Sequence, residues 1–199
     1  MKPYLVGIDE AGRGPLAGPV AVGVSVIRHD FDWGLLPGVD DSKKLSENRR
    51  EQIYAAACQL RKEQFLTFTV ATIGPGLIDD VGIAKAIPLA IRRALSRLSL
   101  QPADTRILLD GSLKAPPAYT DQMTIIGGDA IEPAISLASI VAKVTRDRFM
   151  KRIAQEPEYV AYKFDVHKGY GTKAHRAAIS EHGLSSMHRR SYCKNVVLL

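Results

Sequence analysis

The chain has 199 residues, of which 46% are hydrophobic and 24% are charged, as expected for one domain with a full hydrophobic core. This composition excludes a membrane-spanning protein, because no apolar run approaches the ~20 residues that a spanning helix needs. The N-terminus lacks the features of a secretory signal peptide, and Cys58 and Cys193 lack metal-ligand spacing. We therefore expect a cytoplasmic protein whose cysteines are reduced packing residues.

The formal net charge is +6, and much of the excess lies in three segments, 143–152, 167–176 and 188–194. A basic surface of this kind suits a phosphate backbone, although positive charge also serves solubility alone. The charge pattern favours a nucleic acid partner without identifying one.

In chain order, the hydrophobic pattern predicts β-β-α-β-α-β-β-α-α. The strands are expected at residues 3–9, 19–28, 64–73, 105–110 and 123–129, and the helices at 45–62, 76–99, 133–151 and 172–183. The short Gly-rich link between the first two strands predicts an antiparallel hairpin, so the sheet cannot be purely parallel. The fold class is therefore α/β, with a mixed five-stranded sheet flanked by helices and a helical C-terminal extension.

Local signals mark the ends of the predicted helices. Ser46 and Thr172 are suitable N-cap residues, Pro133 suits a first helical turn, and Gly183 suits a helix end. Pro88 lies inside the long helical pattern at 76–99, where we expect a kink or a change of register.

Three of the predicted strands run directly into carboxylates: Asp9 and Glu10, Asp110, and Asp129. If these strands are neighbours, the four acids converge and repel one another unless they are protonated or hold divalent cations. Oxygen ligands without His or Cys indicate Mg²⁺ or Mn²⁺, and Asp9, on the most central strand, is the best candidate to bridge two ions. The competing interpretation is that each acid is a turn former or a helix cap, which is less favoured for three strand ends in one chain.

The segment "GIDEAGRGPLAGPV" (7–20) resembles the opening signature of the ribonuclease HII, or type 2 ribonuclease H, family. The resemblance continues in order through "DSKKLS" (41–46), "LLDG" (108–111), "GGD" (127–129), "ASIVAKVTRD" (138–147), "HKGYGTKAH" (167–175) and "HRRSY" (188–192). It implies a ribonuclease H-like catalytic core over 1–155, with a C-terminal helical segment over 156–199 packed on that core.

Carried over by position, the resemblance implies a site. The family's metal-binding acids match Asp9, Glu10, Asp110 and Asp129, and its Gly-Arg-Gly segment, which recognises a 2′-hydroxyl and the scissile phosphate, matches Gly12, Arg13 and Gly14. Its tyrosine, which stacks on the sugar of the following deoxynucleotide, matches Tyr170. The implied reaction is two-metal endonucleolytic cleavage of RNA–DNA hybrids and 5′ of single ribonucleotides in duplex DNA. It leaves 3′-hydroxyl and 5′-phosphate ends and serves primer removal and ribonucleotide excision.

Further residues fit contacts to phosphates. Lys43 and Lys44 lie in the "DSKKLS" match, and the helix at 133–151 presents a stripe of hydroxyl and basic side chains. This stripe is formed by Ser136, Ser139, Lys143 and Arg146. A solvated charge pair and a solvated helix face are the alternatives. Asp165 and His167 lie near Tyr170 without an assigned role.

The sequence departs from the family pattern at several positions, and these departures bear on the expected packing, partners and enzyme type. Ser136 and Leu137 stand where small alanines are more usual. The ending "CKNVVLL" lacks a glutamine-plus-aromatic motif, which makes sliding-clamp binding doubtful. The absence of residues before Met1 and the aspartate at 129 disfavour a type 3 enzyme. We expect a monomer. A non-catalytic hybrid binder and a type 1-like nuclease that needs several consecutive ribonucleotides are the alternative functions.

Overall fold

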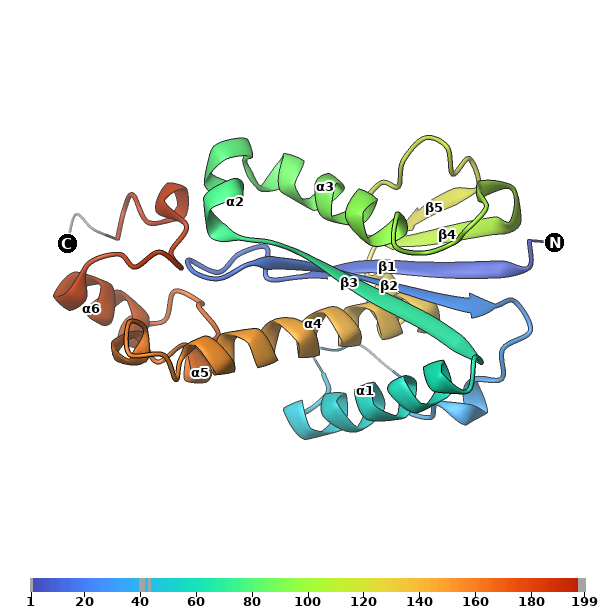
Figure 1. Ribbon diagram of the computed structural model, residues 1–199, viewed down its shortest axis with the longest axis horizontal. Coiled ribbons are helices and arrows are strands. Elements are labelled where there is room, and N and C mark those ends of the chain that lie inside the picture. The colour runs from blue at the N-terminus through green and yellow to red at the C-terminus, as the bar shows by residue number, and fades with distance from the viewer. Residues whose placement is uncertain (1, 40–41, 43, 197–199) are drawn as a thin grey trace.

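The computed structural model describes residues 2–39, 42 and 44–196. A five-stranded sheet lies between two layers of helices (Figure 1). In chain order the strands are β1 (Tyr4–Ala11), β2 (Val20–Arg28), β3 (Leu66–Ile73), β4 (Thr105–Asp110) and β5 (Gln122–Ile125). Their order across the sheet is β3-β2-β1-β4-β5, so β1 is the central strand.

The sheet is mixed, as the sequence predicts. β1 pairs antiparallel with β2, and β2 pairs antiparallel with β3. β4 is parallel to both β1 and β5. Because β1 and β4 are parallel neighbours, Asp9 and Asp110 lie at the same end of the sheet.

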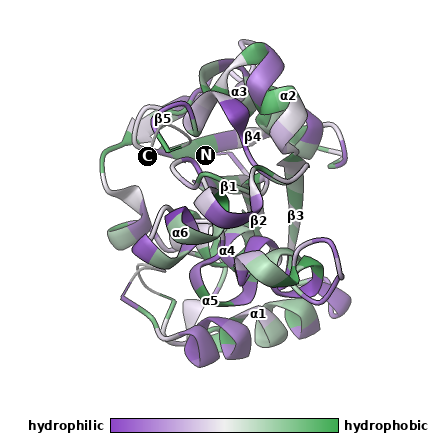
Figure 2. Ribbon diagram, turned by 90° about the vertical axis from the view of Figure 1, so that its left-hand side faces the viewer, coloured by the Kyte–Doolittle hydropathy of each residue, from purple (hydrophilic) through white to green (hydrophobic). Residues whose placement is uncertain are grey.

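Two helices cover each face of the sheet. α2 (Pro75–Val81) and α3 (Ile83–Leu95) lie on one side, and α1 (Glu47–Lys62) and α4 (Pro133–Ile153) lie on the other (Figures 1 and 2). Val6 and Ile8 of β1 pack in one hydrophobic cluster with residues of α3. Side chains alternate along a strand, so Gly7 and Asp9 face α4 instead.

The α4 helix lies unusually close to the sheet because two facing residues have no side chain. A Cβ atom on Gly7 would lie 2.1 Å from the carbonyl oxygen of Ala134, and one on Gly23 would lie 2.1 Å from that of Ala138. Ser25 of β2 also donates a hydrogen bond of 2.6 Å to the Ala134 carbonyl. This close packing brings the middle of α4 against the end of β1, where Asp9 lies.

Two predictions about local structure are wrong. The pattern at 76–99 forms two helices that meet at Gly82, and α3 continues through Pro88. Gly82 has a φ of +78°, which other residues rarely adopt, so the helical pattern is interrupted there. The strand predicted at 123–129 ends at Ile125, and Asp129 lies on the short 3₁₀-helix η3 (Gly128–Ala130).

The C-terminal segment packs against the end of α4 and the loop between β1 and β2. The segment contains η4 (Val160–Tyr162), α5 (Phe164–His167), α6 (Lys173–His182) and η5 (Arg190–Tyr192). Two short 3₁₀-helices lie earlier in the chain, η1 (Trp33–Leu35) and η2 (Pro102–Asp104). An aromatic cluster that includes Tyr159, Tyr162 and Phe164 packs on Met150 of α4. Ala17 in the β1–β2 loop forms a β-bridge with His188.

Several smaller expectations hold. Ser46 caps α1 by accepting from the Arg49 N–H, and Thr172 caps α6 by accepting from the His175 N–H. Gly183 ends α6. Both cysteines are free thiols. Across the described residues, no helix has the length and apolar character needed to cross a membrane.

Candidate active site

A cavity of about 240 Å³ opens at the end of β1 and gathers residues from distant parts of the chain. It is lined by Asp9, Glu10, Ala11, Gly12, Arg13, Gly14, Ser42, Asp110, Ser139, Lys143 and Tyr170. Three of the four predicted acids therefore share one cavity with the Gly-Arg-Gly segment and the predicted tyrosine. The β1–β4 pairing and the close approach of α4 to β1 create this juxtaposition.

Asp9 is the most buried acid of the cavity, with 4% of its surface exposed. Its Oδ1 accepts a hydrogen bond of 2.7 Å from the Glu10 N–H. The pKa of Asp9 is raised to about 8, chiefly by burial and also by the negative charges of Glu10 and Asp110, while a hydrogen bond with Ser139 opposes the shift. The ionised form of Asp9 is therefore unfavourable here unless a cation lies beside it.

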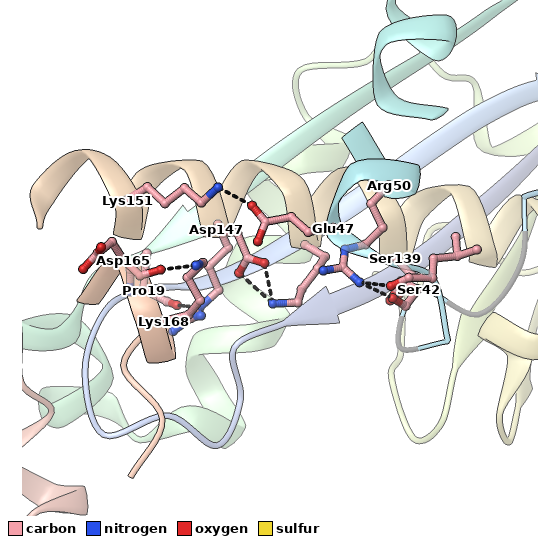
Figure 3. A network of polar contacts seen from close by, with 12 residues as sticks. Pro19, Ser42, Glu47, Arg50, Ser139, Asp147, Lys151, Asp165 and Lys168 are labelled. Carbon is pink, nitrogen blue, oxygen red and sulfur yellow. Dashed lines mark hydrogen bonds and ion pairs between the residues drawn. The ribbon is translucent and has the colours of Figure 1, made fainter. Parts of the chain in front are cut away.

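The hydroxyl that supports Asp9 is itself held in place. The Ser139 Oγ on α4 lies 2.8 Å from the Ser42 Oγ. When Asp9 is ionised, Ser139 donates its one proton to that carboxylate, and Ser42 is then the donor in the second bond. Arg50 of α1 in turn donates to the carbonyls of Ser42, at 2.7 Å, and Leu45, at 2.5 Å (Figure 3). No local pattern in the sequence predicts this chain of contacts, because it joins segments that are far apart along the chain.

The remaining acids differ in their surroundings. Glu10 pairs with Arg13 at 3.4 Å. Asp110 accepts a hydrogen bond of 2.7 Å from the Gly128 N–H, which ties the end of β4 to the turn before η3. Asp129 is buried and is not among the residues that line the cavity, although it directly follows Gly128, which is bonded to Asp110.

The donor chemistry of this group fits a hard divalent cation, since every candidate ligand is a carboxylate oxygen. The raised pKa of Asp9 also indicates that its ionised form lacks a compensating positive charge. Within the described ranges, however, no three His, Cys, Asp or Glu side chains stand together closely enough to hold a metal ion. The acids therefore fit Mg²⁺ or Mn²⁺ in kind, although no three of them converge on one point in the described structure.

The Gly-Arg-Gly segment forms one wall of the cavity. Gly12 has a φ of +89°, and a Cβ atom there would lie 2.1 Å from the Arg146 Nε, so only glycine fits. Gly14 is different, because a Cβ atom on it would meet nothing within 4 Å. Neither backbone angle nor packing requires glycine at position 14, which leaves open space for a ligand to approach the backbone. Tyr170 lies on the cavity wall with 44% of its surface exposed.

The residues predicted to contact phosphates lie in different surroundings. Lys143 lines the cavity and donates to both carboxylate oxygens of Asp147 at 2.6 Å (Figure 3), while burial lowers the pKa of Lys143. Lys44 is exposed, and Lys43 lies outside the described residues. Ser139 reaches the cavity but is already bonded to Asp9.

The predicted polar stripe on α4 is wrong at two of its four positions. Arg146 is 1% exposed and donates to the carbonyls of Pro19, at 2.9 Å, and Ala17, at 3.1 Å. Ser136 is buried and donates to the carbonyl of Asp129 at 2.6 Å. Helical spacing placed these residues on one face, but the β1–β2 loop and η3 cover that face, so it is not open to phosphates.

The two unassigned residues near Tyr170 lie outside the cavity wall. His167 donates through Nε2 to the Tyr162 carbonyl at 2.7 Å, because its Nδ1 accepts from the Gly169 N–H at 3.2 Å. Asp165 is exposed. The described geometry gives His167 a structural role in the turn before Tyr170.

Sequence reasoning missed one buried residue that touches the site. Arg189 donates to the carbonyls of Gly12 and Arg13, at 2.6 and 2.9 Å. It lies in the "HRRSY" segment, where basic residues suggested a nucleic acid surface, and only its complete burial reveals a different role.

The comparisons with known proteins agree on one family. Residues 6–195 match the family model described as Ribonuclease HII. The Ribonuclease HII of Bacillus cereus (strain Q1) is 44% identical over 189 residues, which cover 95% of this chain and 68% of the relative. That of Bacillus thuringiensis (strain Al Hakam) is 43% identical with the same coverage.

Solved structures share the architecture. The ribonuclease H2 from Pyrococcus horikoshii OT3 has a TM-score of 0.71 at 24% identity and covers 98% of this chain and 97% of its own. The PCNA:RNase HII complex from Archaeoglobus fulgidus has a TM-score of 0.70 at 27% identity, covering 94% and 93%. The Bst-RNase HIII structure in complex with Mn²⁺ has a TM-score of 0.69 at 14% identity, covering 99% and 70%. These likenesses confirm the predicted mixed-sheet fold.

Proposed function

Since the chain belongs to the ribonuclease HII family of endonucleases, we propose that it hydrolyses the RNA strand of RNA–DNA hybrids and cuts 5′ of single ribonucleotides in duplex DNA. The products carry 3′-hydroxyl and 5′-phosphate ends. The cellular role is ribonucleotide excision and primer removal. Its partners are the hybrid and the ribonucleotide-containing duplex, on which it acts as a cytoplasmic monomer.

The observation that carries this proposal is the placement of Asp9. A buried carboxylate lies beside Glu10 and Asp110 in a cavity that the Gly12–Gly14 segment also lines. A protein that only binds hybrids gains nothing from carboxylates that face phosphates, because like charges repel. Hydrolysis assisted by cations gives these acids a purpose.

Asp9, Glu10, Asp110 and Asp129 are the proposed ligands of two Mg²⁺ or Mn²⁺ ions. When bound, such ions activate a water molecule and stabilise the leaving oxygen in an in-line displacement. Ser139 holds the Asp9 carboxylate through its hydrogen bond. The tie between Asp110 and Gly128 keeps η3, and with it Asp129, near the same end of the sheet.

The substrate is read beside the acids. The Gly12, Arg13 and Gly14 backbone recognises the 2′-hydroxyl and the scissile phosphate, since a hydroxyl is both a donor and an acceptor. Tyr170 stacks on the sugar of the next deoxynucleotide. Phosphates contact Lys43, Lys44, Ser139 and Lys143.

Contact with a sliding clamp is a separate question. The Archaeoglobus fulgidus relative was solved as a complex with PCNA. Direct measurement of binding between this chain and a clamp decides whether it shares that contact.

One assay tests the proposed function. A DNA duplex with a single embedded ribonucleotide is incubated with the protein and Mg²⁺, with EDTA in a parallel reaction. Cleavage 5′ of the ribonucleotide that is lost with EDTA and in Asp9→Asn is expected. Binding without cleavage would instead support a hybrid-binding protein, and activity restricted to long hybrids would support a type 1-like nuclease.

A further inference from the structure

The C-terminal segment reaches under the Gly-Arg-Gly segment with one fully buried arginine. Arg189 is 0% exposed, and each of its three side-chain nitrogens donates to a backbone carbonyl. The acceptors are Gly18, at 3.0 Å, Arg13, at 2.9 Å, and Gly12, at 2.6 Å. The Tyr192 hydroxyl adds a second donor to the Arg13 carbonyl at 3.2 Å.

These bonds fix the direction of two N–H groups. In a trans peptide the carbonyl and the following N–H point in opposite directions, and the described peptide bonds are trans. The Gly12 carbonyl shares its peptide with the Arg13 N–H, and the Arg13 carbonyl shares its peptide with the Gly14 N–H. Because Arg189 holds both carbonyls beneath the loop, both N–H groups point away from Arg189. Arg13 and Gly14 also line the cavity.

Further hydrogen bonds hold the rest of the β1–β2 loop in place. The Arg189 N–H donates to the Leu16 carbonyl at 2.8 Å, and the Gly18 N–H donates to the Met187 carbonyl at 2.8 Å. Arg146 holds the Ala17 carbonyl at 3.1 Å. With these neighbours fixed, the two peptides held by Arg189 have a defined orientation before any substrate arrives.

We propose that Arg189 is a positioning residue for substrate recognition: it sets the orientation of the Arg13 and Gly14 N–H groups that contact the ribonucleotide. This inference rests on the proposed function and extends it to a residue outside the cavity. It also distinguishes arginine from lysine at this position. A lysine ammonium is a single point with no planar fork, so it cannot hold three carbonyls in this arrangement.

The test compares Arg189→Lys with the wild type and with Arg92→Lys, a matched change at an exposed position on α3, across the sheet from α4. Each change is made alone for kinetics and again in an Asp9→Asn background for binding. Kd is measured for a duplex with one ribonucleotide and for the same duplex in DNA alone. The Kd for the all-DNA duplex divided by the Kd for the ribonucleotide duplex reports recognition of the ribonucleotide, and a smaller ratio means weaker recognition. Thermal unfolding reports whether each variant is folded.

We expect Arg189→Lys to lower the ratio about tenfold, the equivalent of one net hydrogen bond. KM for the single-ribonucleotide duplex should rise more than kcat falls, and Arg92→Lys should change neither. An unchanged ratio, or an equal loss of affinity for both duplexes, overturns the inference. If Arg189→Lys does not fold, Tyr192→Phe removes the second donor to the Arg13 carbonyl and must shift the ratio in the same direction by a smaller factor. A wild-type protein that does not cleave at the ribonucleotide contradicts the proposed function itself, whereas normal cleavage with an unaffected ratio in the variants contradicts only the role of Arg189.

Discussion

Two regions of the molecule bury charged side chains in opposite ways. At the end of β1, Asp9 is buried with Glu10 and Asp110 nearby, and burial with this like charge raises its pKa to about 8. Beneath the β1–β2 loop, Arg189 is just as buried, but each of its nitrogens meets a carbonyl oxygen. A buried charge that the protein itself satisfies holds structure together, whereas one left among like charges is suited to bind an external cation.

Two buried histidines of the C-terminal segment, like Arg189, have their polar atoms satisfied by hydrogen bonds within the protein. The Ser185 N–H donates to His188 Nδ1 at 2.9 Å, so His188 carries its proton on Nε2 and donates it to His175 Nε2 at 3.0 Å. His175 then donates from Nδ1 to the Tyr170 carbonyl at 2.9 Å. Both rings are neutral in this chain of bonds, which holds the backbone of Tyr170 at the cavity.

The largest expected effect is the loss of cleavage activity after a change at Asp9, in the acidic region. Asp9→Asn should reduce cleavage of the single-ribonucleotide duplex by about 10³-fold or more, because a neutral amide is a poor ligand for the ions. The same change should leave the free energy of unfolding equal or higher at pH 7, since an amide avoids the cost of protonating Asp9, whose ionised form is unfavourable in the folded protein. Initial rates and urea unfolding check the two statements. Cleavage within tenfold of the wild type would exclude Asp9 as a metal ligand.

The second effect is a loss of stability after a change at Arg146, which lies beside the β1–β2 loop. Arg146→Met should lower the free energy of unfolding by about 3 kcal/mol, because it removes two donors to buried carbonyls, those of Ala17 and Pro19. Arg148→Met, at an exposed position on the same helix that pairs with Glu51, should cost about 1 kcal/mol or less. Urea unfolding of both variants gives the comparison. Similar losses would mean that the carbonyl contacts of Arg146 contribute little.

A third effect comes from pH. Burial lowers the pKa of His175 and of His188 to about 4, from the usual 6.5, with the stacked His167 and the nearby Arg176 adding to the shift of His175. The unfolded chain binds protons below about pH 6.5, while the folded pair does not until about pH 4. Their contribution to stability is therefore complete above pH 6.5 and is lost as the pH falls toward 4, by about 3 kcal/mol for each histidine.

Urea unfolding at a series of pH values measures this loss. His188→Gln should flatten the dependence between pH 6.5 and 4, whereas His182→Gln, a change at an exposed histidine, should not. A His188→Gln profile with the wild-type slope would show that the pair does not set the acid sensitivity.

The smallest effect concerns Tyr170. Tyr170→Ala should reduce cleavage at a single ribonucleotide by about tenfold, in line with the loss of one stacking contact, and should reduce cleavage of a continuous hybrid less. The ratio of kcat/KM for the two substrates measures the difference. Equal losses on both would contradict a role in reading the junction between RNA and DNA.

The sequence by itself determined the parts of this protein that depend on neighbouring residues. Alternating and helical patterns predicted the mixed sheet, Ser46 and Thr172 predicted two helix starts, and acids after apolar runs predicted that Asp9 and Asp110 would meet. These signals are readable because periodicity, capping and strand ends are short-range properties.

Only the tertiary structure decided which side chains are covered and by what. It placed Asp129 on η3, buried Arg146 under a loop more than a hundred residues away in the chain, and joined Ser42 to Ser139. It also turned Arg189 from a surface base into a support for the Gly12–Gly14 backbone. Burial depends on which distant elements pack together, and one segment's residue pattern carries no record of its neighbours in space.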